Sequence, residues 1–142
     1  MINQMKIKLL IFLLLAALTS SAQVTIKNLR CEMLSNPLGI DAVQPRFSWQ
    51  LESSKKNVLQ TSYQIIVSSS EQKLNDGDGD VWKSASINDS RSLLIGYGGK
   101  PLQSATKYFW KVRVITNKGE AFTKEKAFRS AGLPSPFPVG GT

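Results

Sequence analysis

Apolar and polar side chains alternate along "TKYFWKVRVI", residues 106–115, the longest regular stretch of this 142-residue chain. A β-strand points successive side chains to opposite faces of its sheet, so a period of two indicates a strand with two different faces. One face carries Thr106, Tyr108, Trp110, Val112 and Val114, and the other carries Lys107, Phe109, Lys111, Arg113 and Ile115. This pattern constrains the fold strongly, because an apolar strand face needs a second layer to cover it.

Two more segments show the same period. Phe47, Trp49 and Leu51 share a face in residues 46–52, and alternate residues from Tyr63 to Val67 share a face in 62–68. Weaker strands are expected at 24–34, with a phase break that predicts a bulge, around Trp82, at 92–95 and at 120–130. In the last of these, Phe122 and Phe128 are expected on one face.

Turn-forming residues separate these segments, as in "NPLGID", "GYGGKPL" and "NKG". Seven short strands with turns between them predict an all-β fold, a seven-stranded antiparallel β-sandwich. Helix is expected for a single turn in "SSSEQKLND", which Ser70 could cap.

The start of the longest strand resembles a known sandwich motif. Leu102 leads into Tyr108 in a pattern similar to a tyrosine corner, where the phenol bonds the backbone a few residues upstream. With Trp49 in the second strand, this resembles the fibronectin type III pattern. Trp49 and Trp110 share parity with the aliphatic residues of their strands, so we interpret Trp49, Tyr108 and Trp110 as structural.

The ends of the chain differ from its middle. Residues 1–22 combine two lysines, an apolar stretch and small residues before Gln23, which is typical of a signal peptide. The alternative is a retained membrane anchor, but the apolar core from Leu9 to Leu18 is short for a span. The domain is expected at 23–131 and a Pro/Gly-rich tail or linker at 132–142. We therefore expect an exported protein, periplasmic or extracellular, without membrane contact after cleavage.

Composition excludes several kinds of chemistry. The sequence has no histidine, which excludes a Ser-His-Asp triad, a Cys-His pair and a histidine-bound zinc. No pair of its ten acids is placed to flank a glycosidic bond, so no catalytic residue and no cofactor is predicted. The net charge of +8 is spread along the chain, and nucleic acid is not expected as a partner. Cys31, the single cysteine, is interpreted as a buried apolar residue.

Three aspartates alternate with glycines in "NDGDGD", at Asp76, Asp78 and Asp80. A calcium loop of the EF-hand type starting at Asp76 would need glycine at its sixth position and glutamate at its twelfth. Those positions hold Val81 and Ile87, so we favour a turn over a calcium site, and no metal site is predicted.

The order of "LRCEMLSNPLGID", "PRFSWQLES", "QTSYQIIVSSSEQKL", "GDVWKS" and "YFWKVRV" resembles the N-terminal, fibronectin-type-III-like domain of bacterial α-L-rhamnosidases of glycoside hydrolase family 78. The resemblance implies a multidomain exported enzyme that removes terminal rhamnose, with its catalytic glutamates on a later toroid domain. The chain departs from the family in "EAFTKEKAF", where a tryptophan-serine pair is expected. It stops where the family continues, so a truncated or split gene product without the catalytic domain is expected.

The resemblance implies a non-catalytic accessory role. The expected partners are the catalytic and other domains of a rhamnosidase, in cis or in trans, and rhamnose-containing glycans. Trp82, in a short edge strand, and Phe109, on the polar face beside two lysines, are the candidate contact residues. The alternatives are a free-standing carbohydrate-binding module and a protein-interaction module of an exported glycan-degrading system.

Overall fold

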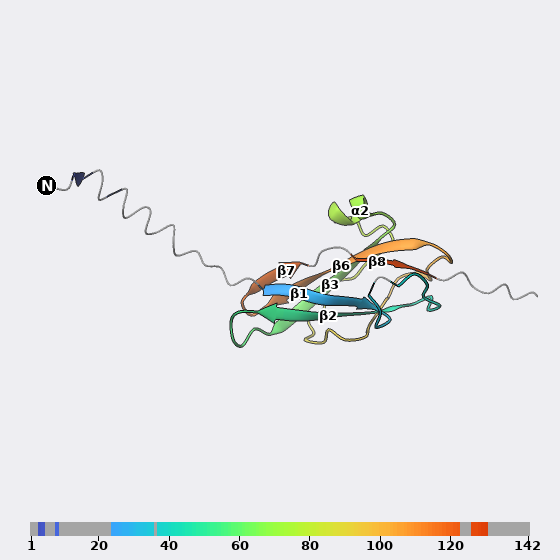
Figure 1. Ribbon diagram of the computed structural model, residues 1–142, viewed down its shortest axis with the longest axis horizontal. Coiled ribbons are helices and arrows are strands. Elements are labelled where there is room, and N and C mark those ends of the chain that lie inside the picture. Colours follow the sequence, from blue (N-terminus) through green and yellow to red (C-terminus); the bar gives the residue numbers. More distant parts are fainter. Residues whose placement is uncertain (1–2, 5–7, 9–23, 36, 123–125, 131–142) are drawn as a thin grey trace, which may run out of the picture.

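The computed structural model describes residues 3, 4, 8, 24–35, 37–122 and 126–130. The expected signal peptide, apart from three positions, and the tail at 132–142 lie outside the described residues. Two antiparallel sheets pack face to face in the described part, with one short helix outside them (Figure 1). The predicted β-sandwich is confirmed.

The smaller sheet has the order β1-β2-β5, from strands β1 (Val24–Cys31), β2 (Arg46–Ser53) and β5 (Ile95–Gly96). The pairing of β1 with β2 shifts register between Lys27 and Arg30, and Asn28 takes a positive φ of 50°. This irregularity is the predicted bulge. It explains why burial changes phase from Val24 to Leu29 and Cys31.

The larger sheet has the order β4-β3-β6-β7, with β8 also paired to β6. Its strands are β3 (Gln60–Ser68), β4 (Trp82–Lys83), β6 (Lys107–Thr116), β7 (Gly119–Phe122) and β8 (Lys126–Arg129). The long pairing of β3 with β6 places the two strongest alternating segments side by side, with Tyr63 opposite Val114 and Val67 opposite Trp110. The alternation therefore produces one continuous apolar face.

The last predicted strand is wrong in one respect, because β7 and β8 are separate strands on different halves of β6. Phe122 is opposite Arg113, whereas Phe128 is opposite Tyr108. Phe128 is buried, whereas the side chain of Phe122 lies outside the described part of the structure, so the expected sharing of one face by Phe122 and Phe128 stays a prediction. The buried residue of β7 opposite Val114 is Ala121.

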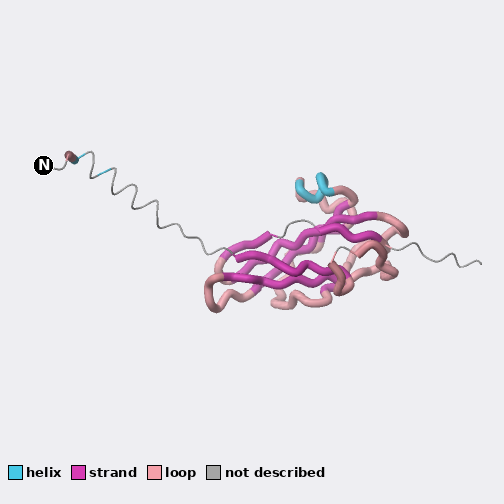
Figure 2. The backbone as a smooth tube through the Cα atoms, in the orientation of Figure 1, coloured by secondary structure: helices cyan, strands magenta, loops and turns pink. Residues whose placement is uncertain are grey.

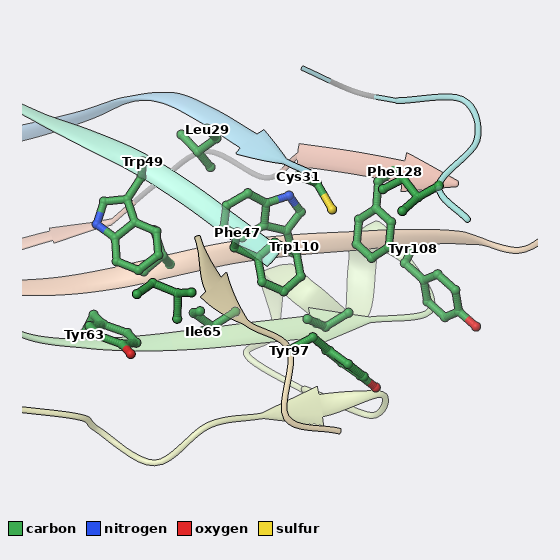
Figure 3. Close-up of a cluster of buried hydrophobic side chains, with 14 of the residues drawn as sticks. Leu29, Cys31, Phe47, Trp49, Tyr63, Ile65, Tyr97, Tyr108, Trp110 and Phe128 are labelled. Carbon is green, nitrogen blue, oxygen red and sulfur yellow. The ribbon is translucent and has the colours of Figure 1, made fainter. Parts of the chain in front are cut away.

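Aromatic side chains fill the space between the sheets (Figure 3). The rings of Phe47 and Trp110 have centroids 4.4 Å apart, and Phe128 meets Phe47 edge-on at 5.9 Å. The ring of Trp49 meets Tyr63 at 5.2 Å. Contacts of this kind contribute about 0.5–1.5 kcal/mol each beyond the area that they bury.

Helix α2 (Glu71–Asn75) lies against the outer side of the larger sheet (Figure 2). The Ser70 side chain accepts a hydrogen bond from the Lys73 N–H, so the predicted cap is confirmed. Leu74 is fully buried, and Ile66 and Ser68 on the outward side of β3 are also buried. This part of the outward face of β3 is therefore shielded from solvent, because the helix and the following loop cover it.

The start of β1 and the end of β8 lie at opposite ends of the sandwich (Figure 1). Val24 is opposite Ser53, where β2 ends, whereas Arg129 is opposite Lys107, where β6 begins. The segment 37–40 runs beside the end of β8, since Arg129 donates its N–H to the Pro37 carbonyl and accepts from the Ile40 N–H, each at 3.0 Å.

Candidate contact surfaces

Trp82 occupies the edge strand β4 and is half-buried against the core. Its indole meets the ring of Tyr97 edge-on, with centroids 5.0 Å apart. The hydroxyl of Tyr97 donates a hydrogen bond of 2.8 Å to the Lys100 carbonyl, which holds the ring in place. The pair closes one side of the sandwich, where the short edge strands β4 and β5 leave both sheets open.

Gly98 and Gly99 let the loop after β5 pack closely against Trp82 and Tyr97. A Cβ atom on Gly98 would lie 3.1 Å from Cζ2 of Trp82, and a Cβ atom on Gly99 would overlap the phenol of Tyr97. The backbone therefore approaches the indole more closely than another residue would permit. This contact covers part of the indole of Trp82, one of the two candidate contact residues predicted from the sequence.

Phe109 lies on the outward side of β6, half-buried, opposite Ser68 of β3. The Nζ atom of Lys107 stands 5.0 Å from the centroid of its ring, within the range of a cation–π contact. Lys107 therefore already contacts one face of the Phe109 ring. A role of Phe109 in contacting a partner stays a prediction.

The aspartate loop is organised around Asp80. Its carboxylate accepts hydrogen bonds from the Ser69 N–H at 2.9 Å, the Ser69 hydroxyl at 2.6 Å and Lys73 Nζ at 2.8 Å. Burial opposes ionisation, but the hydrogen bonds from Lys73 and Ser69 outweigh it and lower the pKa of Asp80 to about 2. Gly77 takes a positive φ of 77°, as a turn requires. No group of three metal-ligating side chains occurs among the described residues.

Other acids form ion pairs on the surface. Glu32 accepts from the Arg46 N–H at 2.6 Å and from its guanidinium at 2.9 Å, and these hydrogen bonds lower its pKa. Asp89 pairs with Arg91 at 2.6 Å in the same way. The first pair ties the turn after β1 to the start of β2, and the second lies within the loop that precedes β5. Each ion pair contains one carboxyl group, whereas glycoside hydrolysis needs two that flank the glycosidic bond.

Gln60 is a buried polar residue that the sequence reasoning missed. Its Oε1 accepts from Nε1 of Trp49 at 2.9 Å, and its Nε2 donates to the carbonyls of Asp89 and Arg91. A register shift between Gln60 and Ser62 turns the side chain inward. The alternation of residues 62–68 does not extend to it, so the sequence offered no signal.

The residues interpreted as structural lie in the interior. Trp49 and Trp110 are almost fully buried, and the Tyr108 oxygen accepts a hydrogen bond of 2.9 Å from the Gln103 N–H. Cys31 is buried and free, and burial raises the pKa of its thiol to about 12. Such a thiol is a packing group and a poor nucleophile. Within the described part of the chain, no helix is long and apolar enough to cross a membrane.

Two antiparallel sheets, the aromatic core and the tyrosine corner define an immunoglobulin-like β-sandwich domain. The model of the family described as "Rha78A-like, N-terminal immunoglobulin domain" matches residues 26–135. The chain belongs to this family.

Known relatives agree with this assignment. An α-L-rhamnosidase of Formosa agariphila is 41% identical over 80 residues, which are 56% of this chain and 8% of the relative. The structure of an α-L-rhamnosidase from Dictyoglumus thermophilum matches with a TM-score of 0.73 and 40% identity, over 78% of this chain and 12% of that one. The Streptomyces avermitilis enzyme, solved with L-rhamnose, matches with a TM-score of 0.72 and 32% identity, over 77% and 11%.

The matched region is thus a small part of each relative. The chain corresponds to the non-catalytic N-terminal immunoglobulin domain of α-L-rhamnosidases, an accessory part of those proteins.

Proposed function

We propose that this chain serves an exported α-L-rhamnosidase as a structural domain that docks against the rest of the enzyme and catalyses nothing by itself. The observation that carries this proposal is the coverage of its relatives. The match takes in more than half of this chain but 8% of the Formosa agariphila protein, and the matching family is an N-terminal domain.

The polar groups of the domain support a structural role. Glu32, Asp80 and Asp89 are held by cations and hydrogen bonds that fix loops, which leaves them poorly placed to move a proton for a substrate. Glycoside hydrolysis requires an acid and a second carboxylate about 5–9.5 Å apart, on either side of the bond. The domain therefore needs a catalytic partner, in cis or in trans.

Turnover of p-nitrophenyl α-L-rhamnoside tests the lack of activity. We expect no release of nitrophenol by the purified chain, while the Dictyoglumus thermophilum enzyme under the same conditions gives the positive signal. Sustained release that survives further purification would overturn the proposal. N-terminal sequencing of protein recovered from the periplasm or medium tests export, with Gln23 expected as the first residue.

Carbohydrate binding is a second candidate function, favoured by the partly exposed indole of Trp82 beside Tyr97. Aromatic faces of this kind stack on sugars when they are open to solvent. Affinity electrophoresis in a rhamnose-containing polysaccharide separates the two functions. Retardation that is lost in Trp82→Ala and kept in Phe109→Ala would favour binding over the structural role.

A further inference from the structure

Exposed apolar side chains are concentrated at one end of the sandwich. Of the eight large hydrophobic residues that are exposed in the described part, two lie elsewhere, Leu59 and Ile87. The other six belong to two segments, 33–43 and 93–94, and we call them the apolar end: Met33, Leu34, Leu38, Val43, Leu93 and Leu94.

Backbone pairing brings the two segments together beside Ser48 of β2. The hydroxyl of Ser48 accepts a hydrogen bond of 2.9 Å from the Leu94 N–H and lies 3.9 Å from the sulfur of Met33. Ser48 belongs to the outward side of β2, because its neighbours Phe47 and Trp49 face the core. Met33 and Leu94 therefore cover the outer surface of the smaller sheet.

The rest of the apolar end lies where β8 finishes. Pro37 and Ile40 exchange backbone hydrogen bonds with Arg129, and Leu38 between them is 87% exposed. The Val43 carbonyl accepts from the Leu102 N–H, just before the start of β6. These loops and the end of β8 occupy the same end of the domain (Figure 1).

Charge is scarce in the longer of the two segments. In the thirteen residues from Met33 to Pro45, Asp41 carries the one charge, although a fifth of the whole chain is charged. The adjacent Glu32 is neutralised by Arg46. Depletion of charge together with exposed Met and aliphatic side chains is typical of the centre of a protein–protein interface.

We propose that the apolar end is the surface by which this domain docks onto the polypeptide that follows it in α-L-rhamnosidases. This rests on the proposed structural function and adds the location of the contact. The occupant follows from two observations. The family is an N-terminal domain that makes up 8–12% of the matched relatives, so most of each relative follows it. The chain leaves its last described strand, β8, at this end of the domain, where Ser130, the last described residue, pairs with Ile40.

The test measures binding of the purified chain to the Dictyoglumus thermophilum enzyme from which the matched N-terminal domain has been removed, by isothermal titration calorimetry. The disrupting variant is Leu34→Asp/Leu38→Asp. The control is Leu59→Asp, which places one such charge on a side chain 64% exposed, at the opposite end beside Asn117. Thermal melts check that each variant is folded.

We expect wild type and Leu59→Asp to bind alike and the double variant to bind at least about tenfold more weakly. Undiminished binding by the folded double variant would overturn the location and leave the structural function standing. Absence of binding by wild type would count against both. If the chain instead sediments as a dimer that only the double variant dissociates, the occupant is a second copy and the proposal fails. Should the double variant unfold, protection of residues 33–43 from hydrogen exchange in the wild-type complex decides.

Discussion

The indole N–H of Trp49 donates a hydrogen bond of 2.9 Å to Oε1 of Gln60 inside the sandwich. The amide of Gln60 in turn donates to two carbonyls of the loop that precedes β5. One buried side chain thus links β2, the start of β3 and that loop, and satisfies polar groups that water cannot reach.

Replacing Gln60 with alanine leaves the Trp49 N–H and two carbonyls without their partner. We expect Gln60→Ala to lower the free energy of unfolding by about 2–3 kcal/mol, because buried groups lose hydrogen bonds that solvent does not replace. Urea denaturation followed by tryptophan fluorescence measures this. Gln50→Ala, an exposed glutamine on β2, should cost less than about 1 kcal/mol, and an equal cost at both positions would contradict the account.

Removing the hydroxyl of Tyr108 tests the tyrosine corner. Tyr108→Phe keeps the ring against Phe128 but loses the bond from the Gln103 N–H. We expect a loss of about 1–2 kcal/mol in unfolding free energy. Tyr63→Phe is the control, since its hydroxyl has no hydrogen-bond partner among the described residues, and it should be close to neutral. A neutral Tyr108→Phe would show that the corner is dispensable.

The loop over Trp82 depends on Gly99. A Cβ atom there would overlap the phenol of Tyr97 and lie 3.0 Å from Cβ of Trp82, so Gly99→Ala must displace the ring pair. We expect a cost of about 1–3 kcal/mol and a shift of the tryptophan emission maximum. Gly96→Ala meets no atom within 4 Å and should have a small effect. Similar melts for the two variants would refute the close approach.

Acid should weaken the fold through Asp80. Its pKa is lowered in the folded state to about 2, so its contribution is present above the unfolded pKa and is lost as pH falls between about 4 and 2. Asp80→Asn should therefore destabilise the protein at pH 6 and have little effect at pH 2. The control is Asp76→Asn, an exposed residue of the same loop. Midpoints of urea unfolding at the two pH values provide the measurement, and a pH-independent difference would exclude this linkage.

The sequence alone predicted much of the fold because the largest energetic term, burial of one face of each strand, has a period that can be read directly. Residues such as Phe47, Ile65 and Val112 needed no knowledge of their partners. The bulge in β1 was predictable for the same reason, since it changes the phase of the pattern.

What could not be predicted depends on contacts between distant segments. Gln60 faces inward because of a register shift against β6, and Ile66 is buried because the helix and the following loop lie over it. The separation of β7 from β8 also follows from how each pairs with β6. None of these appears in local spacing. The apolar end could not be predicted because its residues belong to loops, where the exposure of a side chain depends on the route of the chain.

Because β1 starts at one end of the sandwich and β8 finishes at the other, the domain has a direction. Tension applied between Val24 and Ser130 would run along the strands, and the hydrogen bonds between β1 and β2 lie across it. These bonds would be loaded in shear and resist together instead of opening one at a time. A domain connected at these two ends would transmit tension along its length with little extension.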